Sequence, residues 1–69
     1  PAYDYARISL DRRRDANITV YDMAGTEVYK ECKENAATAI LEVKDWPSGT
    51  YFIQVESEGH IIRTKLIKY

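Results

Sequence analysis

A chain of 69 residues is near the lower size limit at which one hydrophobic core folds unaided, so we expect a single domain over residues 1–69. Ten basic and eleven acidic side chains give a net charge of −1, which excludes a global field attracting nucleic acid. The only cysteine, Cys32, excludes an internal disulfide. No apolar run approaches the roughly 20 residues that span a bilayer. Because the chain begins at Pro1, we interpret it as a piece of a larger protein.

The first half of the chain has two segments with the two-residue period of half-buried strands. Apolar and polar residues alternate over residues 6–10, and again from Asn17 to Asp22. Between them, Asp11–Asp15 carries three arginines between two aspartates, without interleaved aromatic residues. We interpret this segment as a solvated loop tip and not as a nucleic-acid contact.

A tight turn is expected after the second strand segment. Asp22 is suited to accept hydrogen bonds from backbone N–H groups, and Gly25 is suited to a positive φ. These features predict a type I turn followed by a left-handed glycine, with a return strand over residues 26–31. In the expected register, Val20 faces Val28 on the core side of the sheet.

The middle of the chain is less regular. Residues 32–37 are polar and small, which favours a loop, and strand character resumes from Thr38 to Val43. Ile40 and Leu41 are adjacent and cannot share a face, so either a bulge occurs here or one of them packs at an edge. A further turn is expected over residues 45–49, with Gly49 at a positive φ.

The last part of the chain predicts a β-hairpin with a two-residue loop at Glu58-Gly59. This loop pairs Ser57 with His60, and antiparallel partners step apart together from there. One face of the hairpin then collects large apolar residues, which we expect in the core: Tyr51, Ile53, Val55, Ile62 and Leu66.

The opposite face of the hairpin is mixed. It carries an apolar strip crossed by basic residues, made of Phe52, Ile61, Ile67 and Tyr69 with Arg63 and Lys65. The strip is either covered by other parts of the chain or by the partner in a homodimer, or it is a docking surface.

The segments together predict a small antiparallel all-β sandwich, since about six strands are separated by turn signals and no helix is expected. Catalytic chemistry is not indicated. His60 follows a hairpin glycine and is isolated, and Cys32 has no neighbouring base. No metal-ligand spacing or phosphate-binding glycine loop occurs. We therefore expect a non-enzymatic module without cofactor or metal. Trp46 either caps the core or forms a stacking platform for a sugar.

A family resemblance rests on motifs in order along the chain. They are Pro1-Ala2 and Asp4 leading to Ile8-Ser9-Leu10, then Ile18-Thr19-Val20-Tyr21-Asp22-Met23-Ala24-Gly25 with Val28, then Leu41 and Val43, then Trp46-Pro47-Ser48-Gly49 with Tyr51, Ile53 and Val55, and finally Gly59 with Lys65-Leu66-Ile67-Lys68. With these residues the chain resembles the type A C-terminal sorting domain of the type IX (Por) secretion system of Bacteroidetes. The residues that define this fold are expected to be Asp22, Gly25, Gly49, Tyr51, Ile53, Val55 and Gly59. Trp46 departs from the family's usual Leu, and Thr26 from a common basic residue.

The resemblance implies an immunoglobulin-like sandwich of six to seven strands that acts as a secretion signal. The cargo protein is expected to pass through the periplasm and to reach the cell surface or the medium. Its expected partners are the outer-membrane shuttle, the translocon and a sortase that removes the domain and joins the cargo to a lipopolysaccharide anchor. The family places the signal in the last strands, so the candidate recognition residues are Phe52, Ile61, Lys65, Ile67 and Lys68. The alternative is an accessory carbohydrate- or protein-binding module attached to a secreted enzyme.

Overall fold

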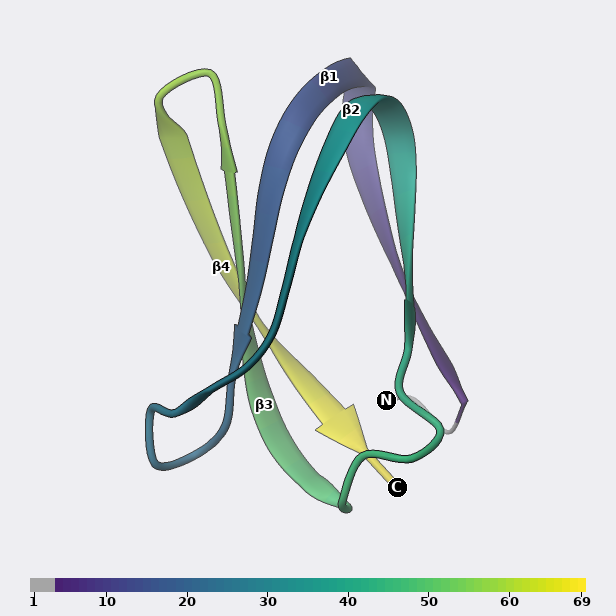
Figure 1. Cartoon of the computed structure of the whole chain (residues 1–69), viewed down its shortest axis with the longest axis vertical. Coiled ribbons are helices and arrows are strands. Elements are labelled where there is room, and N and C mark those ends of the chain that lie inside the picture. Colours follow the sequence, from purple (N-terminus) through teal and green to yellow (C-terminus); the bar gives the residue numbers. More distant parts are fainter. Residues whose placement is uncertain (1–3) are drawn as a thin grey trace.

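The computed structural model describes residues 4–69, which form one four-stranded antiparallel sheet (Figure 1). The strands are β1 (Tyr5–Tyr21), β2 (Glu27–Glu42), β3 (Gly49–Ser57) and β4 (His60–Lys68). Their order across the sheet is β2-β1-β3-β4, so β2 and β4 lie at the edges. The described residues contain no helix. The predicted all-β antiparallel class is confirmed, but there are four strands where six to seven were expected.

The strand count differs because two long strands bend where loops were predicted. Segments 6–10 and 17–21 are the two ends of β1, and segments 27–31 and 38–42 are the two ends of β2. Figure 1 shows both strands arching over together, so that the first half of β1 and the second half of β2 come down opposite β3 and β4. Backbone pairing continues on both sides of the arch. The sequence pattern located all six extended segments but not the continuity between them.

Irregular register makes the bend possible. The pairing of β1 with β2 shifts between Ser9 and Arg14 and again between Arg14 and Ala16. Asn35 has a φ of 49°, which a non-glycine residue rarely adopts. Such local irregularities are the usual means by which a sheet bends sharply. The prediction of a loop tip at Asp11–Asp15 was therefore wrong, although Arg12 and Arg13 are solvent-exposed as expected.

Side chains hold this bend in place. The Oδ1 atom of Asp15 accepts a hydrogen bond from the backbone N–H of Asn35 at 2.9 Å. The guanidinium of Arg13 donates to the carbonyl oxygen of Asn35, also at 2.9 Å. A polar segment that has no apolar alternation thus follows the sheet because its charges bind the neighbouring strand.

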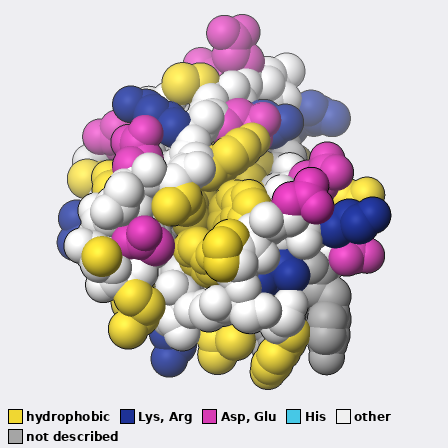
Figure 2. All heavy atoms as spheres, turned by 60° about the horizontal axis from the view of Figure 1, so that its bottom comes forward, with side chains coloured by type: hydrophobic (Ala, Val, Ile, Leu, Met, Phe, Trp, Pro, Cys, Tyr) yellow, Lys and Arg dark blue, Asp and Glu magenta, His cyan; other side chains and the backbone are white. Residues whose placement is uncertain are grey.

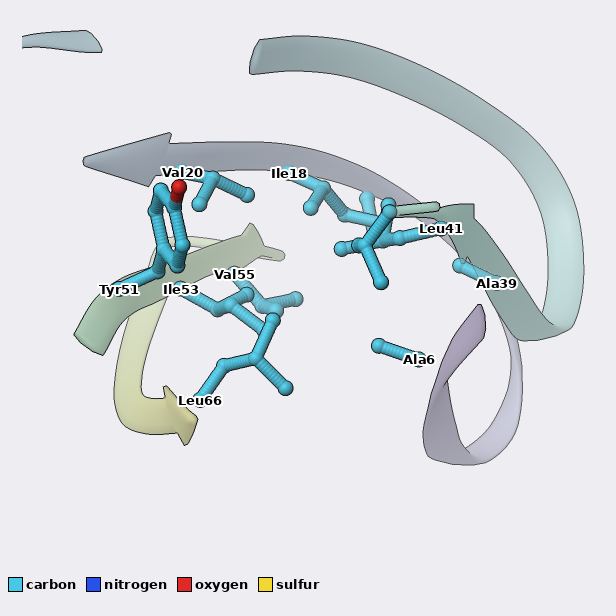
Figure 3. Packing of buried hydrophobic residues seen from close by; sticks show 11 residues of the cluster. Ala6, Ile18, Val20, Ala39, Leu41, Tyr51, Ile53, Val55 and Leu66 are labelled. Carbon is cyan, nitrogen blue, oxygen red and sulfur yellow. The ribbon is translucent and has the colours of Figure 1, made fainter. Parts of the chain in front are cut away.

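The core lies between the two layers made by the bent sheet (Figure 3). We call the two halves of each bent strand its arms. Ala6 of the first arm of β1 and Ala39 and Leu41 of the second arm of β2 enter the core opposite Ile53 and Val55 of β3. The largest completely buried side chains are Ile18, Val20, Leu41 and Val43.

The turn between β1 and β2 has the predicted geometry. The N–H of Gly25 donates to the carbonyl oxygen of Asp22 at 3.0 Å, and Gly25 has a φ of 85°. The Oδ1 atom of Asp22 accepts from the N–H groups of Ala24 and Thr26, each at 2.9 Å. The structural role predicted for Asp22 is thus confirmed.

The expected register holds at Tyr21–Glu27, directly next to this turn, but is wrong by one residue beyond that pair. Val20 pairs with Tyr29 instead of Val28, and Tyr21 pairs with Glu27. Val28 is the extra residue of a bulge and is exposed. A bulge adjacent to a turn changes the register without changing the turn itself, so the turn residues alone did not indicate it.

Ile40 and Leu41 need no bulge. Pairing with β1 is regular here, with Arg7 opposite Ile40 and Ala6 opposite Leu41. Leu41 is completely buried, whereas Ile40 is 51% exposed on the outer side of edge strand β2. The edge alternative of the sequence interpretation is therefore correct.

The final hairpin has the predicted register at every pair from Ser57–His60 to Gly49–Lys68. Glu58 and Gly59 both have positive φ values, 51° and 80°, as a type I′ turn requires. Gly49 also has the expected positive φ, at 151°.

The core assignment within the hairpin was correct except at one position. Tyr51, Ile53, Val55 and Leu66 are buried. Ile62 is 67% exposed, although it pairs with the buried Val55 and therefore points to the same face. Ile62 lies on an edge strand, and no described part of the opposite layer covers it.

Candidate docking surfaces of the final hairpin

The outer face of the β3–β4 hairpin carries most of the predicted recognition residues. Phe52 is 41% exposed and Ile61 is 53% exposed, and Lys65, which pairs with Phe52, is exposed too. Ile67 is half-buried. Four of the five candidates therefore share this face, as the two-residue period of the strands requires.

The apolar residues of this face do not form one continuous strip. Between Ile61 and Phe52 lies the pair of Gln54 and Arg63, in which the Nε–H of Arg63 donates to Oε1 of Gln54 at 3.0 Å. Ile61 is therefore separated from Phe52 by a polar row. The larger apolar group consists of Phe52, Ile67 and Tyr21 beside the ammonium group of Lys65.

Tyr21 belongs to this surface, and the sequence interpretation missed it. It ends β1 and pairs directly with Phe52 in the sheet. Pairing of β1 with β3 joins segments that are not neighbours in the chain, and no local pattern specifies it. The half-buried phenol ring extends the exposed face of Phe52 toward the β1–β2 turn.

Lys68 does not belong to the outer face. It pairs with Gly49, it lies on the same side of β4 as Leu66, and it is only 8% exposed. Its ammonium group donates to the carbonyl oxygen of Tyr69 at 2.8 Å. The side chain thus lies over the end of the core, with its alkyl chain buried and its charge bound to the backbone. We therefore separate Lys68 from the surface formed by Phe52, Lys65 and Ile67.

Three aromatic rings gather at the end of the molecule that holds the β2–β3 loop. Trp46 is half-buried, with ring centroids 6.0 Å from Tyr29 and 5.1 Å from Tyr51. The hydroxyl of Tyr51 donates to the carbonyl oxygen of Pro47 at 2.6 Å and so fixes the loop. Trp46 packs against the core from this position, as the first interpretation expected.

This end of the molecule is hollowed. Figure 2 shows hydrophobic side chains exposed in a central hollow, with charged side chains toward the periphery. One opening at this end has a volume of about 580 Å³, and Trp46, Tyr51, Met23 and Val28 contribute to its lining. Trp46 lies between two tyrosines at tilted angles, 48° to Tyr29 and 53° to Tyr51, so it forms a flat pair of rings with neither of them.

The opposite end of the hairpin is held to the bend by charge. The guanidinium of Arg12 donates to both carboxylate oxygens of Glu58, at 2.7 and 2.5 Å, and Arg14 lies 3.6 Å from the same carboxylate. The hydrogen bond from Arg12 lowers the pKa of Glu58 below its ordinary value, and attraction to both arginines acts in the same direction. The β3–β4 turn is therefore tied to β1 across the arch.

Titratable groups do not converge elsewhere on the described residues. His60 and Cys32 are exposed, on β4 and β2 respectively, which are not neighbours in the sheet. Among residues 4–69, no group of His, Cys, Asp and Glu has an arrangement suited to a metal ion. None of the described segments is a helix of the length and apolarity that crossing a membrane requires.

A sequence model of the secretion system C-terminal sorting domain matches residues 1–69, the whole length of the chain. The chain belongs to this family. A comparison with curated proteins gives no significant match. The family is that of type IX secretion signals, so this sorting domain marks a protein for export across the outer membrane and for contact with the type IX machinery. Sorting domains of this family are in general non-catalytic.

The predicted fold-defining residues of the sorting domain lie at turns and in the core. Asp22 and Gly25 form the β1–β2 turn, Gly59 lies in the β3–β4 turn, and Gly49 begins β3. The remaining three, Tyr51, Ile53 and Val55, are the buried side chains of β3. The motifs that led to the family are thus mainly requirements of folding, whereas the exposed residues of the hairpin are the candidates for recognition.

Proposed function

We propose that this sorting domain directs its cargo across the outer membrane by docking the outer face of the β3–β4 hairpin on the type IX shuttle or translocon. The observation that carries the proposal is the exposed Phe52, flanked by Tyr21 and paired with Lys65, on the strands to which the family assigns the signal. An aromatic residue with a neighbouring cation is typical of residues that dominate binding energy at interfaces.

The chemistry of the surface defines what its partner offers. The partner needs an apolar patch that buries the Phe52 ring and the adjacent Ile67. At the edge of that patch it needs a carboxylate that pairs with Lys65. Ile61, beyond the polar row of Gln54 and Arg63, is a second and separate apolar contact. The partner would recognise this surface only on the folded sorting domain, because the residues of the surface are brought together by the pairing of β1, β3 and β4.

The later stages belong to the same proposal. The cargo passes through the periplasm and reaches the cell surface or the medium, and a sortase removes the sorting domain there. The six arms of the bent sheet, two each from β1 and β2 with β3 and β4, correspond in this view to the strands of an immunoglobulin-like sandwich. The two layers facing each other across the core support this correspondence.

Removal of Lys65–Tyr69 from the cargo is expected to trap the cargo in the periplasm. This truncation also removes the buried Leu66, so a loss of export does not separate a lost signal from a lost fold. Substitutions on the outer face are a sharper test, since they leave the core intact.

We therefore suggest the double variant Phe52→Ser with Lys65→Glu, in a reporter carrying this domain at its C-terminus in a type IX-secreting host. The matched control is Ile40→Ser with Lys30→Glu, which likewise replaces one large apolar residue by serine and one lysine by glutamate, at exposed positions of β2. The hairpin variant is expected to accumulate in the periplasm while the control is exported. Equal export of both variants would refute the proposed docking face.

A further inference from the structure

The two layers of the sheet are not closed on the side of β4. Among the described residues, β4 pairs only with β3, and the first half of β1, from Tyr5 to Ser9, pairs only with β2. Pairing of β1 with β3 is confined to Asn17–Tyr21. The backbone N–H and C=O groups along one edge of β4, and along one edge of the first half of β1, are therefore available to pair with another strand.

A groove of about 450 Å³ lies between these two arms. Its walls come from the first half of β1 and from β4, and its floor comes from Ile53 and Val55 of β3. The main apolar side chains that line it are Ala6, Ile8, Leu10, Ile62 and Leu66. Figure 3 shows the sides of the groove, with Ala6 on one layer facing Leu66 and Val55 on the other.

The exposure of Ile62 indicates that the groove has room for a further segment. By register it faces the core beside Val55, which is 8% exposed, yet Ile62 itself is 67% exposed. An isoleucine on the inner face of a sheet gains stability only when a neighbouring layer covers it. The geometry therefore leaves room for one more extended segment beside β4.

The charge of the walls restricts what that segment is. Arg7 and Lys65 line the groove, and no carboxylate does. Residues 60–69 contain Arg63, Lys65 and Lys68 without any acidic residue, in a chain whose net charge is −1. Toward the bend, a hollow of about 260 Å³ adjoins the groove, and its carboxylate, Asp11, is already paired with Arg14 at 2.6 Å.

A second copy of this chain does not satisfy these charges. Antiparallel pairing of β4 with another β4 about Thr64 brings Arg63 of each copy opposite Lys65 of the other copy. Like charges directly opposite each other destabilise a strand pair. An acidic extended segment has the opposite effect, since its carboxylates lie beside these cations.

We infer that an acidic, extended segment of a partner protein adds to the edge of β4 as a fifth strand and fills the groove. Its apolar residues alternate with acidic ones, because inward side chains meet Ile62 and Leu66 while outward side chains meet Arg63 and Lys65. The added strand satisfies backbone groups of the β4 edge, as in other cases of strand addition. The inference deepens the proposed function, since it describes the chemistry of the secretion partner at a second face of the same hairpin.

The test uses the 69-residue chain and a soluble, end-blocked peptide of the length of β4 in which valine alternates with glutamate. Amide chemical shifts in an NMR titration are expected to change along β4 and along residues 5–10. The variant Ile62→Glu is expected to raise Kd by at least about tenfold, whereas Ile40→Glu, at a similarly exposed isoleucine of β2, leaves Kd unchanged. Added salt is expected to weaken binding, because it screens the charge pairs.

Several outcomes would overturn the inference. Equal binding of a peptide with lysine in place of glutamate would show that charge does not select the occupant. Shifts on the outer face or along β2 would place the contact elsewhere, and concentration-dependent self-association through β4 would assign the edge to a second copy. Absence of binding would mean that the cations of β4 serve to keep the edge unpaired.

Export of the reporter separates this inference from the proposed function. Loss of export in Phe52→Ser, which leaves the groove residue Lys65 in place, with normal export of Ile62→Glu would support the outer face and refute the groove as a partner site. Loss in Ile62→Glu alone, with its fold intact by circular dichroism, would support the groove and refute the outer face.

Discussion

Replacement of Leu41 by alanine is the most direct test of the two-layer core. Leu41 is completely buried in the arm of β2 that faces β3, whereas its neighbour Ile40 is 51% exposed. Removal of a buried leucine side chain typically destabilises a protein by about 2–5 kcal/mol, through lost burial and the cavity that remains. Ile40→Ala is expected to cost less than about 1 kcal/mol, because its side chain is half in water on an edge strand.

The expected loss at Leu41 is large relative to the stability of so small a domain. A folded chain of this length is typically stable by roughly 3–10 kcal/mol. In a domain of 60–100 residues, each kcal/mol lowers Tm by about 4–8 °C, so Leu41→Ala is expected to lower it by about 10 °C or more. Leu41→Val, with an expected loss of about 1 kcal/mol, keeps the comparison measurable if the alanine variant does not fold.

Urea unfolding followed by far-UV circular dichroism gives the free energy of unfolding of all three variants. The expected order of losses is Leu41→Ala, then Leu41→Val, then Ile40→Ala. Equal losses for the two alanine variants, or a larger loss for Ile40, would refute the burial assignment and with it the arrangement of the second arm of β2.

Two further predictions concern the turns at either end of the sheet. Gly25→Val is expected to destabilise by about 1 kcal/mol or more, because a β-branched residue resists the φ of 85°; no atom lies within 4 Å of an added Cβ, so the loss is conformational. In urea titrations Ala24→Val, in the same exposed turn, should have a smaller effect, and unchanged stability of Gly25→Val would contradict the turn. In a pH titration by NMR, the pKa of Glu58 is expected below that of an ordinary glutamate, and Arg12→Ala should raise it. Since the folded pKa is depressed, the contribution of the pair to stability is present above the unfolded pKa and is lost as pH falls through the folded pKa. An unchanged Glu58 midpoint in Arg12→Ala would contradict the pair.

Local sequence determined the extended segments, the two tight turns and the complete register of the final hairpin. The period of two in residues 51–57, together with Glu58-Gly59, leaves one register in which the apolar residues face one side. Asp22 and Gly25 specify their turn through hydrogen bonds within a few residues. The family motifs are of the same kind, since they record turns and buried positions that short stretches of chain require.

Tertiary structure alone decided which segments join, which faces are covered and which residues share a surface. Within the bend at Asp11–Asp15, pairing with β2 resumes at Arg14, and Asp15 and Arg13 bind Asn35, about twenty positions away in the chain. Ile62 has the same alternation as the buried Val55, yet it is exposed because coverage depends on where the opposite layer ends. Tyr21 joined the outer face for the same reason, whereas the two-residue period of β4 by itself places Lys68 on the side of Leu66. A local pattern fixes the direction in which a side chain points, but what it meets there depends on strands distant in the chain.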